Sequence, residues 1–194
     1  MKELEVSSSP FARVPPRRHG EEALVADGRT HTFAELARRE DDLVAALLSA
    51  GVRPGDRVAL RGSNRVETVV ALLGMATAGI TAVLVHPRLT AVEAKALIDD
   101  AEVALSLDDA AVDALLRDGV SAPRPSLPPP RLSDPLAMIY TSGTSGRAKG
   151  AVLTHGSQTL MASTSPFCSS VRSGTVSWLT LADTAVSPMS VCTL

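Results

Sequence analysis

Aromatic side chains are scarce in this chain of 194 residues and make up only 3% of it. A hydrophobic core must therefore be built mainly from Ala, Val and Leu. The two cysteines, Cys168 and Cys192, are too few for a disulfide framework or a metal cluster, and they indicate a reducing compartment. Because the formal net charge is only −2, the composition gives no electrostatic basis for binding nucleic acid or an anionic membrane.

Signals for secretion or membrane insertion are also lacking. Residues 1–5 are rich in charge and do not predict a secretory signal. The uncharged stretch Val69–Val85 approaches the length of a membrane span, but it contains Gly and Thr residues, and its helical spacing changes at Ile80 to a short β-prone run. We interpret it as a helix, a glycine turn and a buried strand, and we expect a cytoplasmic protein without a membrane span.

What the chain does contain is an alternation of helical and strand patterns. Thr32 and Glu35 form a capping box that opens a helix, and Gly51 ends this helix. The same logic predicts helix starts at 64–67 and 90–93. Further expected elements are strands at Arg57–Arg61 and Glu102–Leu107 and a helix at Asp109–Arg117. This order predicts an α/β fold, a layered and largely parallel sheet with helices on both faces.

Composition shifts divide the chain into four parts. We expect a flexible N-terminal segment at 1–20, an α/β subdomain at 21–122 and a proline-rich surface connector at 123–135. Residues 136–194 would hold the loop described next and the start of a following subdomain, which we expect to be truncated. A strand around Trp178 is expected within this last part.

The loop Thr141–Gly150 is the strongest functional signal. It contains four hydroxyl side chains, three glycines and one lysine, and apolar runs flank it on both sides. Glycine lets backbone N–H groups approach an anion, the hydroxyls add donors, and Lys149 adds a mobile positive charge. The loop is not a Walker motif, because Ala148 precedes the lysine and Gly150 follows it. From the residues alone, a phosphate-binding loop and a solvated turn both remain open.

Tyr140–Gly150 resembles the signature loop of the acyl-adenylate-forming superfamily, the AMP-dependent synthetases and ligases that include acyl-CoA synthetases. Ser145 and Ala148 stand where that family usually has Thr and Pro. Three further segments resemble the family in the same order, namely Arg29–Leu36, Gly51–Leu60 and Ala78–Pro87. The resemblance covers about Glu21 to Thr159 and implies the N-terminal portion of that fold.

The resemblance implies a reaction that joins a small-molecule carboxylate to ATP, with release of pyrophosphate, followed by transfer of the acyl group to a thiol such as coenzyme A. Lys149 would be the catalytic residue, and Mg²⁺ would bridge phosphate oxygens without a metal ligand set from this chain. The residues implied in ATP binding are Thr141, Ser142, Gly143, Thr144, Ser145, Gly146 and Lys149. His155 is expected at the surface or at a helix cap, or as the histidine that the family often carries there.

Later elements of the family are not found in the sequence. These are a Thr-Glu pair near the adenine and metal, an aspartate for the ribose and a catalytic lysine in a mobile C-terminal domain. We therefore expect the isolated chain to be inactive and prone to aggregation, with an unknown oligomeric state. The alternatives are a catalytically dead phosphate-binding remnant and a non-functional truncated gene product.

Overall fold

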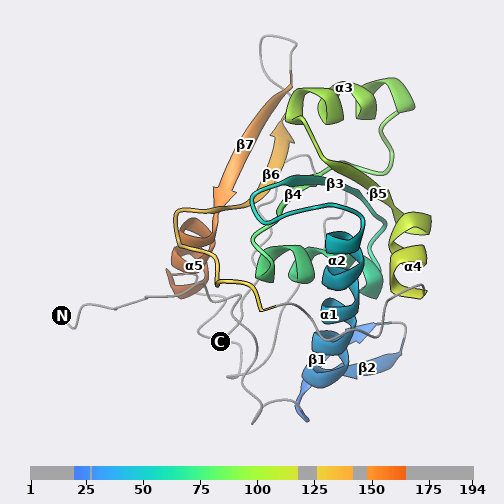
Figure 1. Ribbon diagram of the computed structural model, residues 1–194, viewed down its shortest axis with the longest axis vertical. Helices are drawn as coiled ribbons and strands as arrows, with labels where there is room; N and C mark the ends of the chain where they lie inside the picture. Colours follow the sequence, from blue (N-terminus) through green and yellow to red (C-terminus); the bar gives the residue numbers. More distant parts are fainter. Residues whose placement is uncertain (1–19, 27, 118–125, 142–147, 165–194) are drawn as a thin grey trace, which may run out of the picture.

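The computed structural model of the chain describes residues 20–26, 28–117, 126–141 and 148–164 (Figure 1). Within these ranges a central sheet is surrounded by helices, and a small hairpin lies below the first helix. The elements are β1 (Glu22–Ala26), β2 (Arg29–Thr32), α1 (Phe33–Ser49), β3 (Arg57–Arg61), α2 (Val66–Thr77), β4 (Thr81–Leu84), α3 (Ala91–Ala101), β5 (Leu105–Asp108), α4 (Asp109–Arg117), β6 (Pro135–Thr141), β7 (Lys149–Thr154) and α5 (His155–Thr164).

The central sheet has the strand order β5-β3-β4-β6-β7. Neighbouring strands from β5 to β6 are parallel, and only β7 runs antiparallel to its neighbour β6. Val58 of β3 is in register with Ala82 of β4, which in turn is in register with Ala137 of β6. The prediction of a largely parallel sheet is confirmed.

Helices cover both faces of this sheet. Val58 and Leu60 of β3 pack into a core that also holds side chains from α1, α2 and α4. Ala59, which points to the opposite face, packs instead with residues of α3 and with Met138 of β6. Because successive residues of a strand point to opposite faces, a strand buried on both sides needs apolar residues in succession, such as Val58–Leu60 of β3 and Ala82–Leu84 of β4. The predicted helices on both faces are therefore confirmed.

Helix α1 begins and ends as its sequence predicts. The backbone N–H of Glu35 donates to Thr32 Oγ1 at 3.2 Å, and the backbone N–H of Thr32 donates to the Glu35 carboxylate at 2.9 Å. At the other end Gly51 has a φ of +95°, a left-handed conformation that favours glycine. Its N–H donates to Leu48 O, and that of Val52 donates to Leu47 O, both at 3.1 Å, so the last carbonyls of the helix are satisfied.

Helix α2 begins where the sequence predicts, but without the expected capping box. Its N-cap is Arg65, and no side chain caps the helix. Glu67, which a box would direct back to the N-cap backbone, accepts hydrogen bonds from Arg39 at 2.6 Å and from Arg65 at 3.0 Å instead. The prediction that Asn64 and Glu67 cap each other is wrong, because two guanidinium groups compete for the same carboxylate.

The prediction for α3 is confirmed, whereas that for the next strand is corrected. Thr90 and Glu93 form the expected capping box. Glu102, expected to begin a strand, instead caps the end of α3 in a left-handed conformation with φ +50°. β5 starts only at Leu105, after the N–H of Ala104 reaches Arg57 O at 2.8 Å and brings the chain alongside β3.

The stretch Val69–Val85 divides as predicted into the end of α2, a turn at Gly79 with φ +68° and the buried strand β4. No helix in the described part of the chain is both long enough and apolar enough to cross a bilayer. Of the proline-rich segment, Pro130 is buried and Pro135 already belongs to β6. The strand expected around Trp178 and both cysteines lie outside the described residues.

Candidate functional site

The β6–β7 hairpin carries the described part of the phosphate-loop motif. β6 enters the sheet with three buried residues, Leu136–Met138, and becomes exposed at Thr141. Tyr140 is in register with Gly150, and Thr141 with Lys149. Directly opposed residues of an antiparallel pair project to the same side, with their Cβ atoms about 5 Å apart. The hairpin therefore places the hydroxyl of Thr141 and the ammonium group of Lys149 on one side of its end.

Two of the predicted site residues can be located. Thr141 is the last residue of β6 and Lys149 is the first residue of β7, and both are exposed. The structure brings these two together, although eight positions separate them in the sequence. The other predicted phosphate-binding residues lie outside the described residues, and they are Ser142, Gly143, Thr144, Ser145 and Gly146.

The hairpin end lies at the carboxyl edge of the parallel strands, two residues beyond Ile139, which pairs with the last residue of β4 (Figure 1). The connection after β3 passes through α2 on one face of the sheet, whereas the connection after β4 passes through α3 on the other. In open α/β sheets, ligands bind outside the carboxyl ends of the strands where the connections change face. Thr141 and Lys149 lie at this same carboxyl edge, on the strands next to the β3–β4 pair where the connections change face.

The charge of Lys149 is available to a ligand. Its ammonium group forms no ion pair with any described residue, whereas Lys95 on α3 is paired with Asp99 at 2.7 Å. Within the described ranges no group of three or more His, Cys, Asp or Glu side chains could hold a metal ion. An exposed ammonium beside a hydroxyl, without a carboxylate cluster, is suited to an anion and in particular to a phosphate.

Tyr140 and Gly150 form the neighbouring pair of the hairpin, one step further from its end, and they have contacts that the sequence did not reveal. The Tyr140 hydroxyl donates to Asp100 Oδ2 in the last turn of α3 at 2.7 Å. Partial burial and this carboxylate raise the pKa of the Tyr140 phenol to about 12. Asp100 lies 40 positions before its partner and belongs to no motif, so sequence reasoning had no signal for it.

The surface position considered for His155 is wrong. Its side chain is fully buried at the start of α5, and its backbone N–H donates to Asp134 O at 3.0 Å. Burial lowers the pKa of its imidazole, against an opposing effect of Asp134. His155 directly follows the last residue of β7, so it lies at the opposite end of that strand from Lys149.

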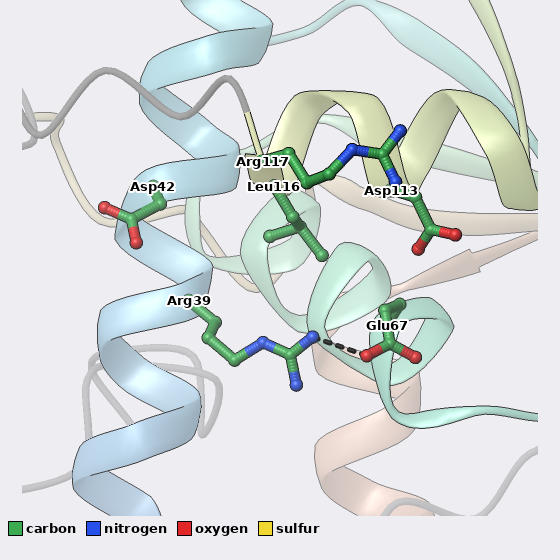
Figure 2. A pocket seen from close by; sticks show the side chains of 6 residues that line it. All are labelled: Arg39, Asp42, Glu67, Asp113, Leu116 and Arg117. Carbon is green, nitrogen blue, oxygen red and sulfur yellow. Dashed lines mark hydrogen bonds and ion pairs between the residues drawn. The ribbon is translucent and has the colours of Figure 1, made fainter.

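A second polar cluster lies on the helical surface between α1, α2 and α4 (Figure 2). Arg39 pairs with Glu67 at 2.6 Å, and Arg65 pairs with both Glu67 and Asp113. Burial acts to raise the pKa of Glu67, but the hydrogen bonds from the two arginines outweigh it and hold this pKa below its usual value. Since the charges here compensate one another, we interpret the cluster as a set of ion pairs that stabilises the packing of the three helices.

Comparison with known proteins identifies the family. The family model for AMP-binding enzymes matches residues 11–192, so the chain belongs to this family. Feruloyl-CoA synthase from Amycolatopsis sp. is 38% identical over 167 residues, which cover 76% of this chain and 32% of that protein. The chain thus spans about a third of the length of this curated relative.

Solved structures agree with this assignment. The N-terminal subdomain of NpsA from Klebsiella oxytoca, in complex with 3-hydroxyanthranilyl-AMSN, superposes with a TM-score of 0.74 at 22% identity, over 81% of this chain and 43% of that one. The o-succinylbenzoate coenzyme A synthetase of Bacillus subtilis, in complex with AMP, superposes with a TM-score of 0.70 at 25% identity, over 85% and 44%. The fold is that of the N-terminal subdomains of adenylate-forming enzymes.

Proposed function

We propose that this chain provides the triphosphate-binding part of an enzyme that activates a carboxylate with ATP, of the acyl-CoA synthetase type. The observation that carries the proposal is the register of Thr141 with Lys149 at the carboxyl edge of the sheet. It puts a hydroxyl donor on one side of the hairpin together with an ammonium that pairs with no described carboxylate. Family membership and the feruloyl-CoA synthase relative support the same chemistry.

In the proposed reaction a carboxylate oxygen bonds to the α-phosphorus of MgATP, and the bond from this phosphorus to the bridging oxygen breaks. Pyrophosphate leaves, and negative charge grows on it in the transition state. The Lys149 ammonium would offset this charge, because fixed positive groups aimed at developing charge supply much of the catalysis in phosphoryl chemistry. Thr141, with the loop residues Ser142 to Gly146, would donate hydrogen bonds to the β- and γ-phosphates. Coenzyme A is the proposed acyl acceptor.

Lys149→Ala tests the proposal, with Lys95→Ala as the matched control. Both lysines are exposed, but Lys95 lies on α3 in an ion pair with Asp99. In the adenylating protein, Lys149→Ala should lower the rate of acyl-adenylate formation by about a hundredfold and change carboxylate affinity far less, whereas Lys95→Ala should alter neither. If the folded Lys149→Ala variant forms the acyl-adenylate as fast as the wild type, the proposal is wrong and the loop is a solvated turn.

A further inference from the structure

Tyr140 links the phosphate-loop hairpin to a helix that is distant in the sequence. Its hydroxyl donates to Asp100 Oδ2 at 2.7 Å, and Asp100 lies in the last turn of α3. A hydrogen bond to a carboxylate is among the stronger ones in proteins. The contact therefore links β6, which ends at Thr141, to α3, which packs on the face of the sheet toward which Tyr140 points.

The same ring also lies over Gly150 on the neighbouring strand. A Cβ atom at Gly150 would lie 3.3 Å from Tyr140 Cζ, and 3.0 Å from Sδ of Met138. Both distances are shorter than ordinary contacts between carbon-sized groups. The absence of a side chain at Gly150 lets the Tyr140 ring pack across both strands, on the face opposite to the one toward which the neighbouring Lys149 projects.

Asp100 is itself held in place from a third element. Arg57 at the start of β3 donates from Nη1 to Ala101 O at 2.9 Å, which fixes the end of α3 against the sheet. The Arg57 charge also acts on Tyr140, where it opposes the rise in the phenol pKa that burial and Asp100 produce. The Tyr140 hydroxyl thus meets a carboxylate whose helix is anchored to β3.

We propose that Tyr140 is a positioning residue for the phosphate site. Through Asp100 and Gly150 it fixes the end of the β6–β7 hairpin relative to α3, and so orients Thr141 and Lys149 toward the phosphates. This inference rests on the proposed function, since it assigns Tyr140 to the same site. Tyr140 would not contact the reacting atoms. It would act through Thr141, which follows it on β6, and through Gly150, which pairs with it on β7 and follows Lys149.

The hydrogen bond can be measured directly, because Tyr140 is the only tyrosine of the chain. A spectrophotometric titration of the phenol should give a pKa of about 12 in the folded wild type. Asp100→Ala should lower it toward the ordinary value of about 10, whereas Asp99→Ala, one position earlier and paired with Lys95, should leave it unchanged. An Asp100→Ala variant that titrates like the wild type would overturn the inference.

The positioning role is tested by the affinity of the protein for MgATP. Tyr140→Phe keeps the ring over Gly150 and removes only the hydroxyl. Tyr140→Phe and Asp100→Ala should each weaken binding by about three- to tenfold, the size of one hydrogen bond. The double variant should be no weaker than either single variant, because both remove the same interaction. Melting temperatures measured alongside separate this effect from a loss of folding.

The possible results distinguish the inference from the function on which it rests. If Lys149→Ala weakens MgATP binding while Tyr140→Phe binds like the wild type, the proposed function stands and the positioning role is rejected. If wild-type protein and Lys149→Ala bind MgATP equally or not at all, both proposals are rejected. Additive losses in the double variant would show that Tyr140 and Asp100 act separately, which also contradicts the inference.

Discussion

At the scale of single residues, Gly150 has little room for a side chain. Gly150→Ala would bring a methyl group to 3.0 Å from Met138 Sδ and 3.3 Å from Tyr140 Cζ. Overpacking of this kind costs about 1–3 kcal/mol, and we expect that loss in the free energy of unfolding measured with denaturant. Gly20→Ala is the control, because nothing lies within 4 Å of a Cβ there. Equal stability of both variants would contradict the packing described at Gly150.

Tyr140 gives the molecule a pH dependence in the alkaline range. The folded state raises the phenol pKa from 10.0 to about 12 and so favours the protonated form. The stability that follows from this shift is fully present below pH 10 and is lost as the pH rises toward 12. We expect the difference in unfolding free energy between wild type and Tyr140→Phe to shrink over this interval. A difference that stays constant from pH 9 to about pH 12 would contradict the shifted pKa.

At the scale of elements, substitutions at two helix starts test which of the predicted capping side chains stabilise their helices. Thr32→Ala removes the side chain that caps α1, and we expect it to lower the free energy of unfolding by about 1 kcal/mol. Asn64→Ala alters a similar sequence signal ahead of α2, but there no side chain caps the helix. We expect this second variant to match the wild type in thermal unfolding. Equal losses in both would mean that Asn64 caps α2 in solution.

The sequence predicts the bounds of an element well when the residues that fix those bounds lie close together in the chain. The bounds of β3 and α4 and the capping boxes at Thr32 and Thr90 follow from residues a few positions apart, and the structure confirms them. The box at Asn64 failed because Arg39, from another helix, takes the carboxylate of Glu67.

The late start of β5 and the order of the strands have causes that lie far apart in the chain. β5 begins where Ala104 meets Arg57, and no local pattern encodes this meeting. For the site, the motif predicted Thr141 and Lys149 but not their register. It also gave no signal for the Tyr140–Asp100 hydrogen bond, which joins two elements 40 positions apart.

At the scale of the whole molecule, we expect these 194 residues alone to show no carboxylate-dependent exchange of pyrophosphate into ATP. Exchange needs adenine and ribose contacts that we do not expect these residues to supply, and the chain spans 32% of its feruloyl-CoA synthase relative. The assay follows labelled pyrophosphate entering ATP with and without added carboxylates. Exchange activity that copurifies with the 194-residue polypeptide would overturn this expectation.

The central claim is that the end of the β6–β7 hairpin binds the phosphates of MgATP, and an amide NMR titration tests it most directly. With increasing MgATP, the account predicts that the largest shift changes occur at Thr141, Lys149 and Gly150, and that they vanish in Lys149→Ala. The mixed-charge cluster around Arg39 and Glu67 serves as an internal reference, and its amides should not move (Figure 2). Shifts that gather at this cluster, or an unchanged hairpin at saturating MgATP, would contradict the account.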